Sequence, residues 1–359
     1  MPIPRLPMQR APRAPTASRR PPELGTAEVT VGIPTFNRSG SLRGSIASVL
    51  AQSYRNFTLV VSDNASDDDT ASVAASFDDP RLVYRRLERN IGRLANFNRI
   101  VELAETEFVL LLGDDDELHP DHLTHTVEAL KRWPTAGVAH TGCEVAGMNG
   151  KTDTRFVQTR RSPMLESGAD FLERSMRSGW TLCFSSALLR KAAFESGGGL
   201  RPEDGVIDDL PLWMRIATGW DFAYVNRPLA TMSLHAESSS SSLGTVTADG
   251  FRSSRALPDM LYEHRRSFLA AADIPEQASK RLARIARKAY RRDRLSHLSG
   301  RARMGEGMGV TFDALAREVR DDPRLGLDPL TWRFVVGQLG GRRIGDRLRG
   351  AAEPLRRRR

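Results

Sequence analysis

Cysteine is scarce in this sequence, with Cys143 and Cys183 the two examples among 359 residues. Two cysteines exclude a disulfide-stapled scaffold and a thiolate-based zinc site, and they are typical of a reducing compartment. Long apolar runs are also lacking. The longest candidate is Phe108 to Leu112, whereas a membrane-spanning helix needs about 20 apolar residues. The first residues carry no apolar core of a secretory signal. We therefore expect a globular protein of the cytoplasm.

Acidic charge is scarce at both ends of the chain. Residues 1–27 hold five arginines and one glutamate, and residues 280–359 hold 22 basic and nine acidic side chains. Residues 28–279 hold 26 basic and 34 acidic side chains, although the whole chain carries a formal charge of +9. A nucleic-acid-binding core should carry its basic groups on its own binding face, so no nucleic acid is expected as a partner. The pattern favours a globular enzyme whose ends contact something anionic.

Strand and helix patterns alternate in the first part of the chain. Residues 1–27 contain seven prolines and are expected to be a disordered basic tail. The alternation that follows is typical of βαβ units with parallel strands, so residues 28–145 are predicted to be one half of an α/β domain. The expected strands are Val29–Ile33, Phe57–Val61, Leu82–Tyr84, Phe108–Leu112 and Gly137–Cys143, and the expected helices are Ser39–Leu50, Ser66–Phe77, Gly92–Ala104 and Pro120–Trp133.

The pattern is less regular in residues 146–250, the second half of the expected domain. Helices are predicted over Gly168–Ser178, Lys191–Ser196 and Leu210–Thr218, and a short strand over Phe222–Val225. Ala236–Gly250 contains five consecutive serines and is expected to be a mobile loop, either an active-site lid or a plain linker. Residues 251–359 are expected to form a basic helical extension, in which Lys280–Arg294 holds eight basic side chains and one acidic side chain.

Polar clusters follow three of the expected strands. They are Pro34–Arg38, Ser62–Ser66 and Gly113–Asp116. Ligands of open α/β sheets bind beyond the carboxyl ends of the strands, so these clusters should meet at one edge. Adjacent carboxylates repel one another unless a cation is present, and oxygen ligands select Mg²⁺ or Mn²⁺. A solvated turn or helix cap is the alternative for Asp114–Asp116, and its position after a buried run favours the metal. Asp67–Asp69 are expected at a helix start, without chemistry.

The run from Val29 to Glu117 resembles the inverting glycosyltransferases of family 2, which have the GT-A fold. The resemblance extends more weakly from Gly197 through His235, so it covers residues 28–240. It implies a Rossmann-like, mostly parallel central sheet flanked by helices, with a nucleotide-binding half at 28–145 and an acceptor half at 146–250. The matching blocks are Val31–Arg38, Ser48–Ser53, Val60–Asp67, Asn90–Gly92 with Asn96 and Asn98, and Leu112–Leu118.

The resemblance also implies roles for single residues. In the matching nucleotide-sugar site, Asp63 accepts a hydrogen bond from the base, and Asn90 and Arg93 lie near the ribose or diphosphate. Glycine occupies the first position of the family's Asp-x-Asp motif, so Asp114 is expected to replace that aspartate. The other residues expected in the nucleotide pocket are Pro34, Thr35, Asn37 and Arg38, and those expected at a metal are Asp115, Asp116 and His235. An ordinary loop histidine is the alternative for His235.

An acceptor hydroxyl needs a base, which the family takes from an acidic pair before a helix. Asp208–Asp209 matches that pattern, so Asp209 is predicted to be the base and Asp208 its neighbour. A simple helix start is the alternative, because Pro211 occupies a first-turn position. His122 and His125 are expected at the surface, because the sequence around them does not complete a zinc site. Three further residues, each expected either to border the acceptor site or to pack in the core, are Trp180, Cys183 and Trp213.

Together these features predict a metal-dependent inverting glycosyltransferase that uses Mn²⁺ or Mg²⁺ and a nucleotide-diphosphate sugar, most simply a UDP-sugar. The expected acceptor is a glycan or lipid-linked glycan of cell-surface polysaccharide or glycoconjugate synthesis. The basic C-terminal region is expected to contact the anionic inner face of the cell membrane, unless it is only a solvated extension. Two alternatives are a sugar nucleotidyltransferase, which usually needs a Gly-rich basic loop after the first strand, and a non-enzymatic anion-binding scaffold.

Overall fold

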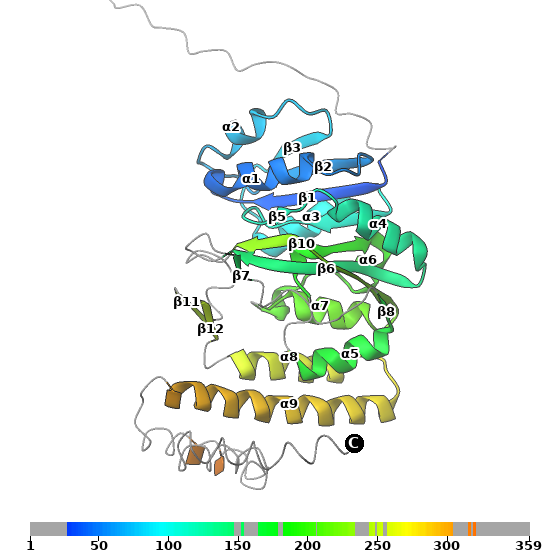
Figure 1. Ribbon diagram of the computed structural model, residues 1–359, viewed down its shortest axis with the longest axis vertical. Coiled ribbons are helices and arrows are strands. Elements are labelled where there is room, and N and C mark those ends of the chain that lie inside the picture. The colour runs from blue at the N-terminus through cyan, green and yellow to red at the C-terminus, as the bar shows by residue number, and fades with distance from the viewer. Residues whose placement is uncertain are drawn as a thin grey trace, which may run out of the picture.

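A computed structural model places one large mixed sheet at the centre of the molecule (Figure 1). Its strands follow the order β3-β2-β1-β4-β9-β6-β10-β5, with β7 beside β6 and β8 beside β10. The predicted α/β fold class is therefore confirmed. The structure describes residues 27–146, 152–153, 164–178, 182–205, 207–233, 244–247, 250–253 and 257–303, together with 315–316 and 319–320.

The first four strands of the sheet, β3, β2, β1 and β4, are parallel as predicted. The helix α2 is shorter than expected and begins at Thr70 instead of Ser66. The reason is local, because the Ser66 amide and hydroxyl are bonded to Asp63 and to the Asn37 amide, outside a helix. The elements of this half are β1 (Val29–Thr35), α1 (Ser39–Leu50), β2 (Phe57–Asp63), α2 (Thr70–Ala75), β3 (Leu82–Arg86), α3 (Arg93–Leu103), β4 (Phe108–Leu111), β5 (Glu117–Leu118), α4 (His122–Arg132) and β6 (Ala136–Ala146).

The second half makes the sheet mixed. The strand β9 (Ala187–Arg190), which periodicity did not predict, lies antiparallel between β4 and β6. The expected strand at Phe222–Val225 is part of a much longer strand, β10 (Asp221–Ser233), which crosses Pro228 with irregular register against β6. The other elements are β7 (Thr152–Asp153), β8 (Met164–Glu166), α5 (Gly168–Arg177), the 3-10 turn η3 (Phe184–Ser186), α6 (Lys191–Ser196), the 3-10 turn η4 (Pro202–Asp204) and α7 (Asp209–Ile216).

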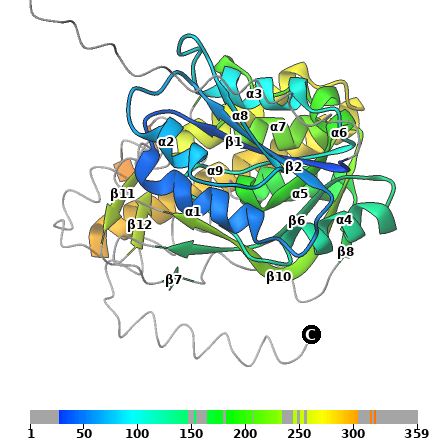
Figure 2. The ribbon, with the colours of Figure 1, turned by 90° about the horizontal axis from the view of Figure 1, so that it is seen from above.

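Both faces of the sheet are buried, as Figure 2 shows from above. Alternate residues of β4 divide between two cores, with Val109 and Leu111 facing α3, α5 and α7, and with Leu110 facing α1 and α4. This burial explains why the strand reads as a continuous apolar run. Gly32 of β1 allows α3 to approach closely, because a Cβ there would lie 2.3 Å from a methyl carbon of Ile100.

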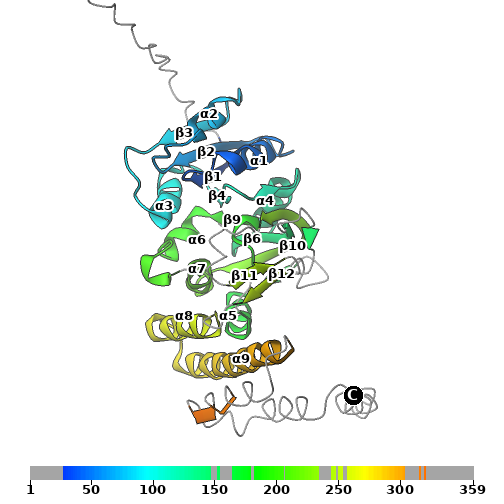
Figure 3. The ribbon, with the colours of Figure 1, turned by 90° about the vertical axis from the view of Figure 1, so that its left-hand side faces the viewer.

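The predicted helical extension begins with α8 (Leu257–Ala271) and α9 (Glu276–Arg303), stacked at the end of the molecule away from β3 (Figures 1 and 3). The helix α9 contacts α5 and α8, which joins the extension to the domain. Part of the expected serine-rich loop is a strand, because β11 (Gly244–Thr247) pairs with β12 (Gly250–Ser253). The predictions for residues 1–26, Trp180, His235 and most of 304–359 lie outside the described residues. Among the described helices, none combines the length and the apolar character that crossing a membrane requires.

Candidate functional site

The three predicted polar clusters lie at one edge of the sheet, at the carboxyl ends of β1, β2 and β4. The Asn64 amide donates to the Thr35 carbonyl at 2.9 Å, and the Leu112 amide donates to the Gly32 carbonyl at 2.9 Å. The Asn64 side chain donates to Asn90 Oδ1 at 2.8 Å. The structure thus brings Asn90 to the same edge, as the resemblance implies.

The corner between β1 and α1 is held by side chain to backbone hydrogen bonds. Asn37 adopts a positive φ of 53°, a conformation that asparagine tolerates better than most residues. Its amide donates to Ser66 Oγ at 2.9 Å, and its Oδ1 accepts from the Asp67 amide at 2.9 Å. These bonds leave Phe36 projecting with 43% of its surface exposed. In this conformation Asn37 shapes the corner that Pro34 and Arg38 also build.

Asp63 is a buried anchor at the end of β2. Its Oδ1 accepts from the Ser66 amide at 2.8 Å, and its Oδ2 accepts from the Tyr84 hydroxyl at 2.5 Å. Arg86 Nε lies 3.7 Å from the same Oδ2, and the Asp63 side chain is 0% exposed. The predicted hydrogen bond from a nucleobase therefore needs Asp63 to be uncovered first.

The turn after β4 gathers Asp114, Asp115 and Asp116. Burial is the largest influence on Asp114 and raises its pKa to about 6, with a further increase from Asp115. Thr35 and Arg38 oppose that increase, which places two residues of the β1 corner beside this carboxylate. The structure thus brings together the first and third predicted clusters.

Asp116 faces the interior from the same turn. Its Oδ2 accepts a hydrogen bond from the Ser185 hydroxyl of η3, and its Oδ1 accepts from the Ser233 amide at 2.9 Å. Burial and the charge of Asp115 raise its pKa. Both oxygens of Asp116 are thus occupied by groups of the acceptor half, and a role at a metal would require these bonds to be released. The described residues contain no group of three acidic, histidine or cysteine side chains arranged to hold a metal ion.

Position 113, where the family motif has aspartate, leaves little room for a side chain in this turn. A Cβ at Gly113 would lie 2.9 Å from Asp116 Oδ2 and 3.0 Å from Asp115 Oδ1, which is closer than side chains normally approach. The Gly113 amide also donates to Ser185 Oγ at 3.3 Å. A side chain in this position would therefore push against the two carboxylates that follow it.

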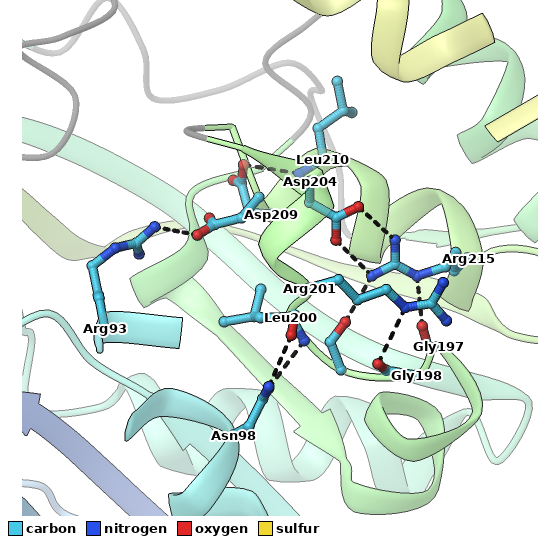
Figure 4. Close-up of polar contacts among 12 residues, drawn as sticks. Arg93, Asn98, Gly197, Gly198, Leu200, Arg201, Asp204, Asp209, Leu210 and Arg215 are labelled. Carbon is cyan, nitrogen blue, oxygen red and sulfur yellow. Dashed lines mark hydrogen bonds and ion pairs between the residues drawn. The ribbon is translucent and has the colours of Figure 1, made fainter. Parts of the chain in front are cut away.

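Asp209 is the first residue of α7 (Figure 4), and Asp208 lies directly before it in the chain. Asp208 forms an ion pair and hydrogen bond with Arg93, the first residue of α3. Burial, followed by the charge of Asp208, raises the pKa of Asp209 to about 7, while the Leu210 amide and the Trp213 side chain lower it. Asp209 can therefore accept a proton near neutral pH, as a general base must.

The loop before α7 is held by residues to which the sequence analysis gave no role. Arg215 binds both oxygens of Asp204 at 3.0 and 2.9 Å and donates to the Gly197 and Gly199 carbonyls at 2.6 and 2.7 Å. Asn98 of α3 binds both the carbonyl and the amide of Leu200, at 2.8 and 3.0 Å (Figure 4). Asn98 stood in a matching block, whereas periodicity gave no signal for Asp204 and Arg215.

Several residues weighed for chemistry are structural. The prediction that His122 is a surface residue is wrong, because its side chain is buried and Nε2 lies 3.0 Å from the Ser186 carbonyl oxygen. Burial lowers its pKa to about 4. Trp213 is also fully buried and packs against Phe184 with ring centroids 5.5 Å apart. Cys183 packs against the core that contains Cys143, and both thiols are free.

Comparisons with known proteins relate this chain to glycosyltransferases. A family model described as "Glycosyl transferase family 2" matches residues 30–198. A GalNAc(5)-diNAcBac-PP-undecaprenol beta-1,3-glucosyltransferase of Campylobacter jejuni is 37% identical over 117 residues, which cover 32% of this chain and 36% of that protein. The succinoglycan biosynthesis protein ExoO of Rhizobium meliloti is 29% identical over 153 residues, which cover 42% and 43% of the two chains. This chain thus spans less than half the length of these two curated relatives.

Solved structures share the fold at low sequence identity. Residues 1–349 of S. aureus TarS in complex with UDP-GlcNAc give a TM-score of 0.55 at 18% identity, covering 71% of this chain and 70% of that one. The mannosyltransferase PcManGT from Pyrobaculum calidifontis, in complex with GDP-Man and Mn²⁺, gives 0.51 at 17% identity, covering 88% and 86%. Residues 30–198 are thus similar to the glycosyltransferase family 2 domain, and the chain shares the fold of these solved glycosyltransferase structures.

Proposed function

We propose that this protein is an inverting glycosyltransferase that moves a sugar from a nucleoside-diphosphate sugar to a hydroxyl group of a glycan. The observation that carries the proposal is the placement of the candidate base. Asp209 lies beside the Arg93–Asp208 contact, and Arg93 begins the helix whose preceding loop is bonded to the nucleotide edge at Asn64. Donor and base therefore lie on neighbouring elements, as a direct displacement requires.

In this reaction the acceptor hydroxyl attacks the anomeric carbon as the nucleoside diphosphate leaves from the opposite face. Asp209 takes the hydroxyl proton, and its raised pKa suits that role at neutral pH. Thr35 and Arg38 line the edge on which the nucleotide binds, with the exposed ring of Phe36 beside them.

We propose that the donor is bound with Mn²⁺ or Mg²⁺. A divalent ion bound here would neutralise charge on the departing diphosphate. The chemistry of the turn fits such an ion, because Asp114 and Asp115 are adjacent carboxylates whose mutual repulsion it would relieve. Asp115 is the principal protein ligand in this proposal, with His235 as a second, and Asp116 supports the turn from below.

The donor we propose is a UDP-sugar, by analogy with the TarS structure in complex with UDP-GlcNAc. The acceptor we propose is a lipid-linked glycan, by analogy with a relative named as a glucosyltransferase of an undecaprenol-linked glycan. Such an acceptor lies at a membrane. Arg284, Arg287 and Lys288 form an exposed basic face of α9, with spacing that places them on one side of the helix. We propose that this face binds the anionic inner surface of the cell membrane, at about 1 kcal/mol per basic residue.

Thermal stability in the presence of nucleotides tests the proposed function. UDP, GDP and dTDP are each added with and without Mn²⁺, and a ligand at 100 times its Kd should add about 2.7 kcal/mol of stability. We expect one nucleotide to stabilise the protein only with metal, and Asp115→Asn to abolish that gain. Asp78→Asn, which changes an exposed aspartate outside the site, is the control. Stabilisation that is independent of metal and of Asp115 would contradict the metal site.

Release of nucleoside diphosphate from UDP-glucose, UDP-N-acetylglucosamine and GDP-mannose then identifies the donor. Co-sedimentation with phosphatidylglycerol vesicles at low salt tests the membrane surface. We expect the triple variant Arg284→Glu, Arg287→Glu, Lys288→Glu to remain in the supernatant, because its charge on that face is reversed. Equal binding by the triple variant would place the membrane contact elsewhere or exclude it.

A further inference from the structure

Arg93 joins the two halves of the domain at the candidate base. It is the first residue of α3, and its guanidinium forms an ion pair with Asp208, which lies 115 positions later and directly before α7. Figure 4 shows the contact reaching across to the start of α7, next to Asp209. The Arg93 side chain is 44% exposed, whereas that of Asp208 is 11% exposed. The contact thus supplies a cation from the solvent side to a nearly buried carboxylate.

Hydrogen bonds fix the start of α3, from which Arg93 extends. Asn64 accepts a hydrogen bond from the Ile91 amide at 2.9 Å, and Asn90 accepts one from the Gly92 amide at 2.8 Å. One turn into α3, Asn96 Nδ2 donates to the Ser62 carbonyl at 2.8 Å. The backbone from which Arg93 extends is therefore tied to the end of β2.

The acceptor side is held up to the residues just before Asp208. Asn98 fixes Leu200, and Arg215 fixes Asp204. Beyond that point the chain enters α7, whose buried side chains anchor it from Leu210 onward. Asp208 and Asp209 lie between these two anchors. Arg93 holds Asp208, while Asp209 Oδ1 accepts a hydrogen bond from the Leu210 amide at 2.8 Å.

The charges around the pair come from several elements. Burial raises the pKa of Asp208, Arg93 lowers it, and Asp204 of η4 raises it. The charge of Asp208 in turn raises the pKa of Asp209. His264 of α8 also lies within the influence of Asp204, and burial lowers its pKa. Arg93 is the cation that acts directly on Asp208 in this group, so it reaches Asp209 through Asp208.

We propose that Arg93 is a positioning residue of the acceptor base, which acts through Asp208 rather than by binding the donor diphosphate. The proposal rests on the proposed function and refines it, because the family resemblance placed Arg93 near the ribose or diphosphate. The two roles differ in what they change. A diphosphate ligand contributes to donor affinity, whereas a residue that orients the base contributes to turnover and to its dependence on pH.

The test compares Arg93→Ala, Arg93→Lys, Asp208→Asn and the double variant Arg93→Ala/Asp208→Asn with the wild type. Arg89→Ala is the matched control, because Arg89 is an exposed arginine four positions earlier, in the loop before α3. Donor affinity is measured by titration with the nucleoside diphosphate, and turnover by nucleoside diphosphate release from UDP-glucose, UDP-N-acetylglucosamine and GDP-mannose across pH 5 to 9.

We expect Arg93→Ala to lower kcat by about 10- to 100-fold, because small displacements of a reacting group have costs of this size. Nucleotide affinity should stay within about threefold of the wild type. The acidic limb of the pH profile should move to higher pH, because the acidic pair loses its cation and holds a proton more tightly. Asp208→Asn should move that limb to lower pH, and Arg93→Lys should restore it towards the wild type.

The double variant supplies the decisive comparison. If Arg93 acts through Asp208, adding Arg93→Ala to Asp208→Asn should leave the pH limb where Asp208→Asn placed it. A full additional shift would overturn the proposal, as would a loss of nucleotide affinity equal to the loss of kcat. A pH profile of Arg93→Ala that coincides with the wild type would also overturn it.

Hydrogen exchange of residues 207–212 keeps the proposal testable if the wild type releases no nucleotide and the proposed function fails. Loss of the contact should then still speed exchange at the start of α7 in Arg93→Ala and not in Arg89→Ala. Unchanged exchange in Arg93→Ala would show that the contact does not position the pair.

Discussion

Two regions of this domain are stabilised by contacts over very different sequence distances. One is the proposed nucleotide edge, at the carboxyl ends of β1, β2 and β4, and the other is the proposed acceptor side, around the start of α7 and the end of β10. At the nucleotide edge, Asn37 bonds Ser66 and Asn64 bonds Asn90, over 29 and 26 positions. On the acceptor side, Arg93 reaches Asp208 over 115 positions and Asp116 reaches Ser233 over 117. The first set of contacts lies within consecutive βα units, whereas the second set joins elements that are far apart in the sequence. The donor edge is thus a local structure, and the acceptor side depends on the assembled sheet.

The largest expected effect concerns the acceptor side. Asp209→Asn should reduce turnover by about 10²- to 10⁴-fold, because it removes the proposed proton acceptor. Nucleotide affinity should be unchanged, since the nucleotide edge is held by its own bonds. Steady-state kinetics and nucleotide titration check both halves of the expectation. A parallel loss of nucleotide affinity would show that the two regions are less independent than their contacts indicate.

Arg215→Ala should be the most destabilising change in this comparison. It removes one partner of a largely buried ion pair and leaves Asp204 uncompensated, which costs about 3–5 kcal/mol. Arg81→Ala in the first half of the domain is the matched change, because Arg81, directly before β3, pairs with Asp79 only two positions away. Urea denaturation should show a smaller loss for Arg81→Ala, and equal losses would remove the distinction between local and distant support.

Gly113→Ala tests whether the packing of the turn after β4 affects nucleotide binding. The added Cβ would crowd Asp115 and Asp116, and such overpacking costs about 1–3 kcal/mol. Metal-dependent nucleotide binding should weaken, and Gly113→Asp should weaken it further although it restores the family motif. Thermal shifts with and without Mn²⁺ measure both changes. Stronger binding by Gly113→Asp would show that the carboxylates can move apart freely.

The smallest expected effect is a change in pH dependence. Burial and Asp115 raise the pKa of Asp116 in the folded protein. A raised carboxyl pKa stabilises the protonated folded state at low pH, and this stability is lost as pH rises through the folded pKa. Asp116→Asn should therefore flatten the loss of stability between pH 5 and 8 by about 1 kcal/mol or more. Melting curves across that range would refute the expectation if both proteins change in parallel.

The difference between local and long-range contacts also explains which elements could be predicted from the sequence. Periodicity located β1, α1, β2, β3, α3 and β4 within a few residues, because each buries an apolar face next to its chain neighbours. Gly113–Asp116 was recognisable because it follows a fully apolar strand. Periodicity could not predict β9, which is four residues long and enters the sheet between strands made earlier.

In the candidate site, the residues of the sequence motifs could be predicted, but their long-range partners could not. The edge residues Thr35, Asn90 and Asp114 lie together as the motif order implies. The partners of Asp116 and Asp208 were not predictable, because Ser185, Ser233 and Arg93 become neighbours only in the folded sheet. His122 was misjudged because a buried imidazole bonded to a carbonyl has no distinct sequence pattern.

The position of β9 has a consequence for how the protein forms during synthesis. Residues 28–145 include β4 and β6, yet these strands do not pair with each other, because β9 lies between them. A growing chain that has left the ribosome only as far as β6 therefore leaves unpaired the edges of β4 and β6 that β9 later joins, and unpaired strand edges promote aggregation. Those edges close once residues 187–190 emerge, so a pause in translation before that point should be more harmful than one after it.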